Sequence, residues 1–342
     1  MALQPHWEGL IIFVYMEFRT TFPIPPYPKK LVYGQPVFSM GSCFSGLLES
    51  KLSEGKFEVM SNPFGIMYNP VSILRLLAAC LRGEGLDAGG VLTYQGRYFH
   101  YDLHSSIHAS SVQELMHNFG ETSSSVVKIL SSCSHVIFTW GTSFVHEHRE
   151  RNVMVANCHK QPAFLFEKKL LSVSDMMDAF SDFMDLLIPI NPAARVVVTV
   201  SPVRHTKDGI PANQLSKSLL RVFCHELTCK GMPVDYFPSY ECLVDDLRDY
   251  RFYRQDMIHP SETAEDYIWG LFIKAFMEPS VARTYEEVVK VKRSMAHRPF
   301  LQDSDEHRRF LKILIGKMEN FEPPLDFSEE ISILGQRLGG TE

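Results

Sequence analysis

The sequence predicts an α/β fold: a three-layer α/β/α sandwich built around a five-stranded parallel sheet, followed by a C-terminal helical extension. Short apolar runs rich in β-branched residues alternate with segments whose apolar residues recur at helical spacing. A continuous apolar run such as Arg195–Val200 is typical of a strand buried on both faces. Because such strands alternate with helices, we expect the strands to be parallel.

Five apolar runs bounded by turn residues are the predicted strands. In chain order they are Pro36–Met40, Phe57–Met60, His135–Thr139, Arg195–Val200 and Val234–Phe237. Segments between them have apolar residues at helical spacing, among them Val71–Leu81, Val173–Leu187 and Gln214–Cys229. After about residue 280 the sequence is charged and helical in pattern, with no strand-like run.

We expect three parts in the chain: an N-terminal extension over residues 1–30, a main domain over 31–280 and the helical extension over 281–342. Residues 10–16 are apolar, but this stretch is too short to span a bilayer and lacks the flanking features of a signal peptide. Met16 is an alternative start, and the proline-rich run Pro23–Pro28 predicts an extended arm.

Composition narrows the class of protein. The 342 residues are 45% hydrophobic with a net charge of −6, which is ample for one large globular domain. No block rich in Lys and Arg occurs, so we expect no nucleic-acid partner and no membrane partner. The seven cysteines are dispersed, which favours a reducing compartment, and we predict a cytoplasmic protein.

Polar and glycine residues follow every predicted strand, at the edge where parallel sheets hold their functional groups. The first strand ends at Gly41, and Asp256 and His259 form a D-x-x-H pair just before a helix that Ser261 is expected to cap. A carboxylate three residues before a histidine can hydrogen-bond its Nδ1–H and leave Nε2 free to accept a proton. With Ser42 after the first strand, this pair forms a candidate Ser-His-Asp triad.

Two neighbouring residues, Ser42 and Cys43, are candidate nucleophiles. Ser42 could instead cap the following helix, but with Asp256 and His259 in the same chain we predict that it is the nucleophile. If Ser42 points into the site, Cys43 should point elsewhere and pack as a small apolar residue.

Several histidines and one arginine are further candidates for substrate-binding or metal-binding residues. Arg204 and His205 follow the fourth strand, and we weigh equally a solvated loop and a place in the cleft, where they would bind an anionic or hydroxylated substrate. His104 could likewise lie on a solvated loop or line the cleft. His100, His104 and His108 recur every four residues, but their segment is strand-like, so they would not share a face. We predict no metal and no cofactor.

Several longer motifs resemble the GSCFA-domain family of bacterial proteins, within the SGNH (GDSL-like) hydrolase superfamily. They are GSCFSG, NPFGIMYNPVSI, DLHSSI, VANCHKQP, SPVRHTKDGIPANQLSKS and YFPSYECLVDDLRDYRFYRQDMIHPSETA. The resemblance runs from about Phe18 to Phe276 and implies the strand order 2-1-3-4-5. It also implies that Ser42, Asp256 and His259 are the catalytic residues.

The resemblance implies an oxyanion hole as well. Its donors would be the backbone N–H groups of Ser42 and Gly65 and a side-chain amide. Many SGNH enzymes supply that amide from an Asn after the third strand, but here the motif is GTSF and has only Gly141. We expect Asn157 in its place, with Asn69 as the alternative. Asn69, His104, Gly141, Arg204 and His205 are the predicted substrate-binding residues.

The function expected from these residues is that of a serine esterase or acylhydrolase, needing no cofactor and acting on a small-molecule or carbohydrate ester such as an acetyl ester. The same residues would support O-acyl transfer if a sugar hydroxyl replaced water. The competing class is a non-catalytic ligand-binding protein that retains the fold.

Overall fold

The structure is a computed structural model that describes residues 19–296 and 304–339. The predicted alternative start at Met16 and the apolar residues 10–16 lie outside the described residues. Within these ranges, every helix is too short or too polar to cross a membrane.

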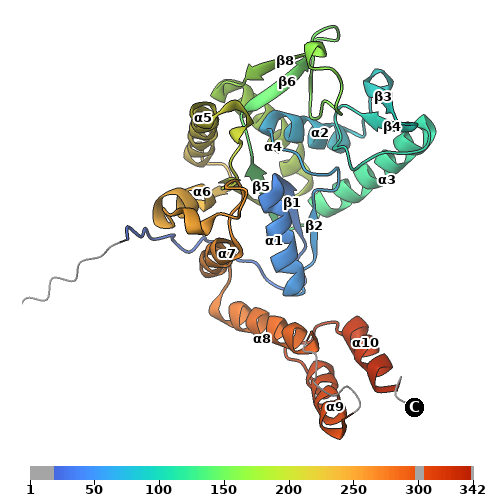
Figure 1. Cartoon of the computed structure of the whole chain (residues 1–342), viewed down its shortest axis with the longest axis vertical. Coiled ribbons are helices and arrows are strands. Elements are labelled where there is room, and N and C mark those ends of the chain that lie inside the picture. Colours follow the sequence, from blue (N-terminus) through green and yellow to red (C-terminus); the bar gives the residue numbers. More distant parts are fainter. Residues whose placement is uncertain (1–18, 297–303, 340–342) are drawn as a thin grey trace, which may run out of the picture.

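A five-stranded sheet forms the centre of the molecule. Its strands are β1 (Val37–Gly41), β2 (Val59–Ser61), β5 (His135–Trp140), β9 (Arg195–Val200) and β10 (Val234–Tyr236). They lie in the order β10-β9-β5-β1-β2, and every neighbouring pair is parallel (Figure 1). Numbered along the chain, this is the order 2-1-3-4-5, so the predicted sheet is confirmed.

Helices cover both faces of this sheet, which confirms the three-layer sandwich. The helices α2 (Pro70–Arg82), α3 (Val112–Leu130), α4 (Val173–Ile190) and α5 (Ile210–Cys229) pack on one face, and α1 (Cys43–Glu54) and α7 (Glu262–Phe276) pack on the other. Successive strand residues alternate between the two cores, as the two-residue period of a strand requires: Phe138 faces the first and Ile137 the second. Burial on both faces explains the continuous apolar runs in the sequence.

Two small antiparallel sheets were not among the predicted elements. One is the hairpin of β3 (Val91–Tyr94) and β4 (Arg97–His100), and the other is formed by β6 (Phe144–His148), β7 (Val153–Val155) and β8 (Phe166–Leu170). The remaining short elements are η1 (Ala88–Gly90), η2 (Ala163–Leu165), η3 (Thr206–Asp208), α6 (Ser239–Glu241), η4 (Cys242–Asp246) and η5 (Tyr250–Phe252).

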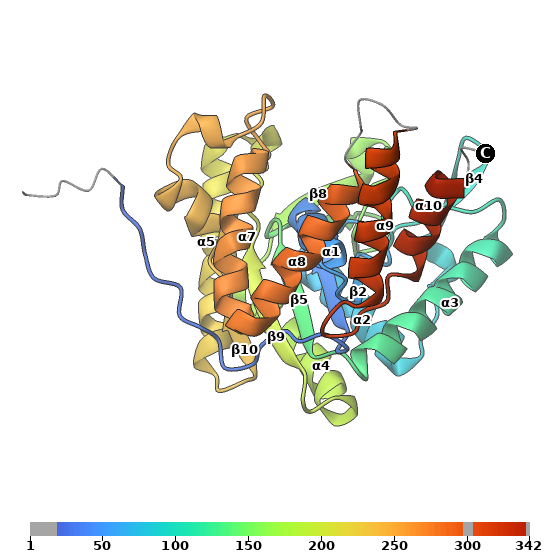
Figure 2. The ribbon, with the colours of Figure 1, turned by 90° about the horizontal axis from the view of Figure 1, so that it is seen from below.

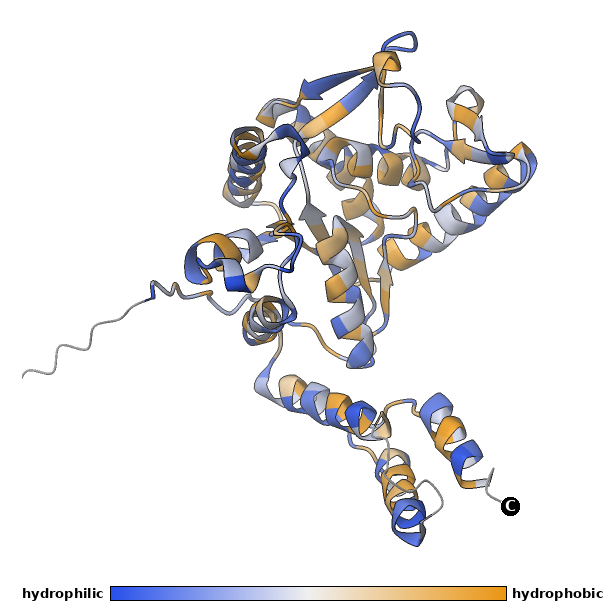
Figure 3. Cartoon of the chain, viewed as in Figure 1, coloured by the Kyte–Doolittle hydropathy of each residue, from blue (hydrophilic) through white to orange (hydrophobic). Residues whose placement is uncertain are grey.

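The C-terminal residues form three helices: α8 (Pro279–Met295), α9 (Asp305–Glu319) and α10 (Ser328–Gly339). They lie at one end of the molecule and share an apolar cluster of their own, and hydrophobic and hydrophilic residues alternate along them (Figure 3). Lys56, just after α1, donates to Glu330 of α10 at 2.8 Å. This contact links the C-terminal helices to the segment after α1. The predicted helical extension is confirmed, whereas the three domain boundaries stay predictions.

Residues 19–36, which include the described part of the predicted N-terminal extension (19–30), contain no helix and no strand. It runs beside the end of α7, where the N–H groups of Tyr27 and Leu31 donate to the carbonyls of Ala275 (3.0 Å) and Phe276 (2.7 Å) (Figure 2). The proline-rich run thus lies in a segment without helix or strand, and the extended arm stays a prediction.

Candidate active site

A cleft of about 640 Å³ opens at the carboxyl edge of the central sheet. Residues that follow β1, β2, β5 and β9 line it, together with the loop before α7. The side chains that matter most for its chemistry are Cys43, Tyr68, Asn157, His205 and His259. The polar strand ends of the sequence therefore converge on one place, because the carboxyl ends of parallel strands meet at one edge.

The turn after β1 is tightly enclosed. Gly41 has φ +152°, and a Cβ added to it would lie 2.2 Å from the carbonyl oxygen of Thr139 in β5. Its N–H donates to Asn62 Oδ1 at 2.8 Å. Only glycine fits so close to the neighbouring backbone, and α1 begins two residues later at Cys43.

Ser42 does not reach the cleft. Its side chain is fully buried, and Oγ accepts the N–H of Phe44 at 3.3 Å as the N-cap of α1. Its own N–H donates to Thr139 O at 3.0 Å. In this structure Ser42 is therefore the helix cap that the sequence also allowed, and its roles as nucleophile and as oxyanion donor stay predictions.

Cys43, the rival candidate, lines the cleft. It is partly exposed, and its Sγ lies 3.9 Å from the hydroxyl of Tyr68. It is the first residue of α1, and its backbone N–H has no hydrogen-bond acceptor among residues 19–296 and 304–339. The first N–H groups of a helix are left unpaired in this way and attract negative charge.

His259 and Asp256 make the contact that their spacing predicted. Nδ1 of His259 lies 2.7 Å from Oδ2 of Asp256, and Oδ1 of Asp256 accepts the N–H groups of His259 (3.0 Å) and Ile258 (2.8 Å). These bonds, led by the backbone N–H of His259, hold the pKa of Asp256 well below its ordinary value. The aspartate is therefore ionised and orients the imidazole, whose ring borders the cleft.

The loop that carries this pair is fixed to the loop after β9. Arg204 donates from its backbone N–H to Ile258 O at 3.1 Å and from its guanidinium to Met257 O at 3.0 Å. Arg204 lines the cleft, and its guanidinium also lies 5.4 Å from the ring centroid of Tyr253. Ser261 caps α7 as predicted, accepting the N–H of Ala264 at 3.4 Å.

His205 lies on the inner wall of the cleft. Burial, assisted by the nearby Lys217 ammonium, lowers the pKa of His205 to about 4, so the ring is neutral at neutral pH. It packs edge-on against Tyr68, with ring centroids 5.1 Å apart.

Lys217 of α5 is a residue that the sequence interpretation missed. It is only 2% exposed, and its Nζ donates to the carbonyls of Gly141 and Ser201 at 2.8 Å each. Burial lowers its pKa to about 7. Lys217 thereby joins the loops that follow β5 and β9, directly behind the cleft. Its sequence context, in the middle of an amphipathic helix, contains no signal for this.

The cleft lining also does not include Gly65, His104 or Gly141. The N–H of Gly65 donates to Asn62 O at 2.8 Å, so it already has an acceptor in this structure, and its role as the second oxyanion donor stays a prediction. His104 packs against Gly65, where an added Cβ would lie 2.3 Å from His104 Cβ, and its Nδ1 lies 2.8 Å from Ser106 Oγ. His104 is therefore not a wall of the cleft.

The two candidate amides differ. Asn69 borders the cleft, but it caps α2 by accepting the N–H of Val71 at 2.9 Å and donates to Phe144 O at 3.1 Å. Asn157 also borders the cleft, and its Oδ1 accepts the N–H of His159 at 2.8 Å. Its Nδ2 has no protein acceptor in the described part of the chain, so of the two it is the available donor.

The histidine clusters do not gather around one point. His100 Nε2 lies 2.9 Å from Asp87 O, and His108 lies beside Arg97. His146 lines the cleft, and burial lowers its pKa. In residues 19–296 and 304–339, no three His, Cys, Asp or Glu side chains are grouped so as to hold a metal ion.

Two protein-family models match parts of this chain. The model of the GSCFA family matches residues 36–272, and a second model, the C-terminal domain of GSCFA domain proteins, matches residues 288–339. No curated protein matches the chain.

Two solved structures illustrate the likeness in fold. A mutant acetyl esterase with acetate ion is 12% identical, with a TM-score of 0.33 over 74% of this chain and 99% of the other. A carbohydrate esterase family 3 protein from Talaromyces cellulolyticus is 9% identical, with a TM-score of 0.34 over 74% and 99%.

Proposed function

The chain belongs to the GSCFA family, and we propose that it is an acyl-ester hydrolase with a Cys43–His259–Asp256 triad. The observation that carries the proposal is that Cys43 and His259 line the same cleft, and that Asp256 orients the His259 ring from behind. A nucleophile, a base and a group that orients the base are the parts that covalent acyl transfer needs.

The thiol is favoured over the Ser42 hydroxyl by position. Cys43 Sγ reaches the cleft from the start of α1, whereas Ser42 Oγ is buried and accepts a helix N–H. A thiolate is the nucleophilic form of cysteine, and the N-terminus of a helix favours negative charge.

In the first half of the reaction, Nε2 of His259 takes the thiol proton and Sγ attacks the acyl carbon of the ester. Asp256 stabilises the imidazolium that forms, and it stays ionised because its pKa is lowered. The tetrahedral intermediate collapses to an acyl thioester on Cys43. The bond to the alkoxy oxygen breaks, and the proton on His259 passes to the leaving alcohol.

In the second half, His259 removes a proton from water, which attacks the thioester carbon. The acid leaves and Sγ regains its proton through His259, so the enzyme returns to its starting form. An alcohol in place of water would give acyl transfer. Because the His259 side chain is 37% exposed, water can reach the base, and this favours hydrolysis.

The substrate class we propose is a small hydroxylated ester, such as an acetyl ester of a carbohydrate. The cleft has room for a small ligand, and its lining is rich in hydrogen-bonding groups. Asn157, after β7, and Arg204, after β9, can bind hydroxyl groups, while Phe144 and Tyr68 offer flat apolar surface.

The test uses p-nitrophenyl acetate as acyl donor and iodoacetamide as thiol probe. We expect wild-type protein to release p-nitrophenol and to be alkylated at Cys43. Cys43→Ala should abolish both, and His259→Ala should slow both by about 10²–10⁴-fold, the usual contribution of general base catalysis. Peptide mapping separates Cys43 from Cys229, the exposed cysteine that serves as an internal control.

Ser42→Ala decides between the two nucleophiles. It should retain acyl release within about tenfold, with a lower melting temperature, because loss of an N-cap costs about 1 kcal/mol. Labelling by a fluorophosphonate that disappears in Ser42→Ala, with Cys43→Ala still active, would instead establish the serine triad. No release and no selective alkylation would favour the non-catalytic binding protein.

A further inference from the structure

The proposed reaction needs hydrogen-bond donors for the oxygen that becomes negatively charged on the acyl carbon. The N–H groups of Ser42 and Gly65 are occupied by Thr139 O and Asn62 O. The N–H of Cys43 is available, since it starts a helix and has no acceptor among the described residues. An oxyanion hole usually contains more than one hydrogen-bond donor, and here only one backbone N–H is available. We therefore expect the second donor to be a side chain beside Cys43 Sγ.

Tyr68 is the polar side chain that touches the thiol. Its hydroxyl lies 3.9 Å from Cys43 Sγ and borders the cleft. The oxygen of an acyl group on Sγ lies two bonds from the sulfur, so a donor at this distance can reach it with an ordinary bond of roughly 2.7–3.1 Å.

The position of Tyr68 is fixed by the loop after β5. The N–H groups of Gly141 and Thr142 both donate to the carbonyl of Tyr68, at 2.8 and 3.1 Å. The absence of a side chain at Gly141 is what lets the ring approach, because an added Cβ would lie 2.9 Å from Tyr68 Cβ and 3.2 Å from His205 Nε2. This is the loop whose sequence, GTSF, lacks an asparagine.

We propose that the Tyr68 hydroxyl is the side-chain donor of the oxyanion hole, acting with the backbone N–H of Cys43. The inference rests on the proposed function and assigns a catalytic residue to it. During attack the phenol O–H donates to the developing oxyanion and keeps its proton, which remains on Tyr68 when the thioester forms. No other group has to be added.

The protonation of Tyr68 suits this role. Burial, with a contribution from the neighbouring Cys43, raises the pKa of Tyr68 to about 12, so the phenol is a donor throughout the range in which thiols react. The neutral His205 ring beside it brings no competing charge.

The test is Tyr68→Phe, which removes only the hydroxyl. We expect kcat for p-nitrophenyl acetate to fall by about 10²–10³-fold, as when another oxyanion donor is removed, with KM changed less than threefold. Alkylation of Cys43 by iodoacetamide should keep its wild-type rate, because alkylation forms no oxyanion.

Tyr33→Phe is the matched control. Tyr33 is also partly buried with a raised pKa, and its hydroxyl donates to Gly55 O at 3.0 Å, away from the cleft lining. This variant should keep full activity, and equal melting temperatures of the two variants would show that folding is not the cause of a loss in Tyr68→Phe.

Two results would overturn the inference. If Tyr68→Phe keeps kcat within threefold, the hydroxyl is not an oxyanion donor. If alkylation of Cys43 slows together with acyl release, Tyr68 acts on the thiol instead. Failure of the proposed function would look different, since wild-type protein would then show neither acyl release nor His259-dependent alkylation.

Discussion

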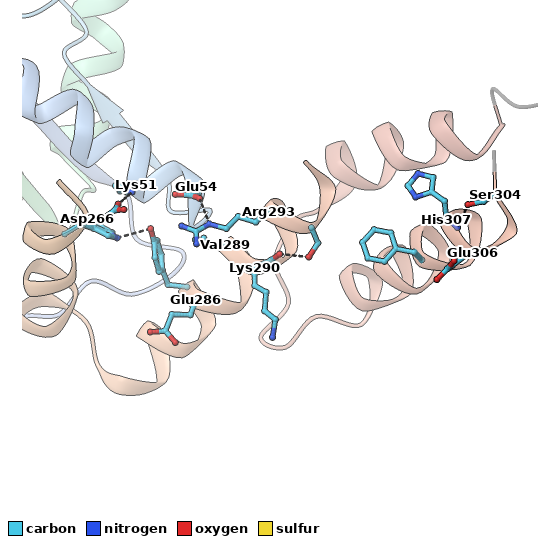
Figure 4. A pocket seen from close by; sticks show the side chains of 14 residues that line it. Lys51, Glu54, Asp266, Glu286, Val289, Lys290, Arg293, Ser304, Glu306 and His307 are labelled. Atoms are coloured by element: carbon cyan, nitrogen blue, oxygen red, sulfur yellow. Dashed lines mark hydrogen bonds and ion pairs between the residues drawn. The ribbon is translucent and has the colours of Figure 1, made fainter. Parts of the chain in front are cut away.

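The groove beside the C-terminal helices is larger than the cleft above the sheet, at about 1000 Å³ against about 640 Å³. Figure 4 shows the side chains that line the groove, with Arg293 beside Glu54. Lys51 and Asp266, 2.6 Å apart, form a second pair of opposite charges there. In both pairs the opposite charges neutralise each other, and the paired side chains are in part exposed to solvent.

The cleft is smaller but chemically different. Its histidine is oriented by a carboxylate, its cysteine starts a helix, and a buried lysine holds the loops behind it. Volume alone would favour the groove. The cleft is distinguished instead by an imidazole that a carboxylate orients and by a cysteine N–H that has no acceptor among the described residues.

The largest difference between the cleft and the groove is expected when one carboxylate in each is replaced by an amide. Asp256→Asn should lower the rate of p-nitrophenol release by about 10²–10⁴-fold, because the imidazole loses the carboxylate that fixes its tautomer and stabilises its positive charge. Asp266→Asn, in the groove, should leave the rate within twofold. Equal rates for the two variants would show that Asp256 does not support His259.

The cleft and the groove should also differ in how they contribute to the pH dependence of the free energy of unfolding. The folded-state pKa of His205 is about 4, below the ordinary 6.5, because burial and Lys217 disfavour the charged ring, while Asp208 opposes this. The unfolded chain therefore binds the proton more readily, and the stabilisation present above pH 6.5 is lost as the pH falls towards 4. The loss attributable to His205 is at most about 3 kcal/mol.

Urea unfolding at pH 7 and pH 4.5 measures this effect. His205→Gln should lose less stability between the two pH values than wild type, whereas His307→Gln, in the groove, should follow wild type. Parallel curves for all three proteins would contradict the assignment of His205 as a buried neutral ring.

The smallest effect is expected from the ion pairs of the groove. Lys51→Ala removes the contact with Asp266, whose side chain is 64% exposed, so solvent screens the pair. The free energy of unfolding should change by less than about 0.5 kcal/mol, and acyl release should not change. A loss of several-fold in activity would mean that the groove is coupled to the cleft.

The inner strands β1, β5 and β9 were predictable because their residues are largely apolar, and burial on both faces demands that composition. The strand β8, by contrast, is FEKKL, in which only Phe166 is buried. Its polar residues face solvent, so no periodicity separates it from a loop. The same holds for the hairpin of β3 and β4, where Thr93 and Tyr94 are exposed.

The Asp256–His259 contact was predictable because it is local: three residues in a loop bring the carboxylate to the ring. The choice between Ser42 and Cys43 was not local. It depends on where α1 begins relative to the sheet, because the cap residue turns back to the helix N–H groups and the next residue points outwards.

The sequence motifs identified the family, and the resemblance they carry implied the order of the five strands. The helical C-terminus and the oriented histidine followed from apolar periodicity and from a hydrogen bond between near neighbours in the chain. Only the tertiary structure decided that Cys43 lines the cleft, that Tyr68 touches it and that Lys217 is buried behind it. These three depend on the packing of segments separated by 16 to 76 residues, which brings together groups that no local pattern relates.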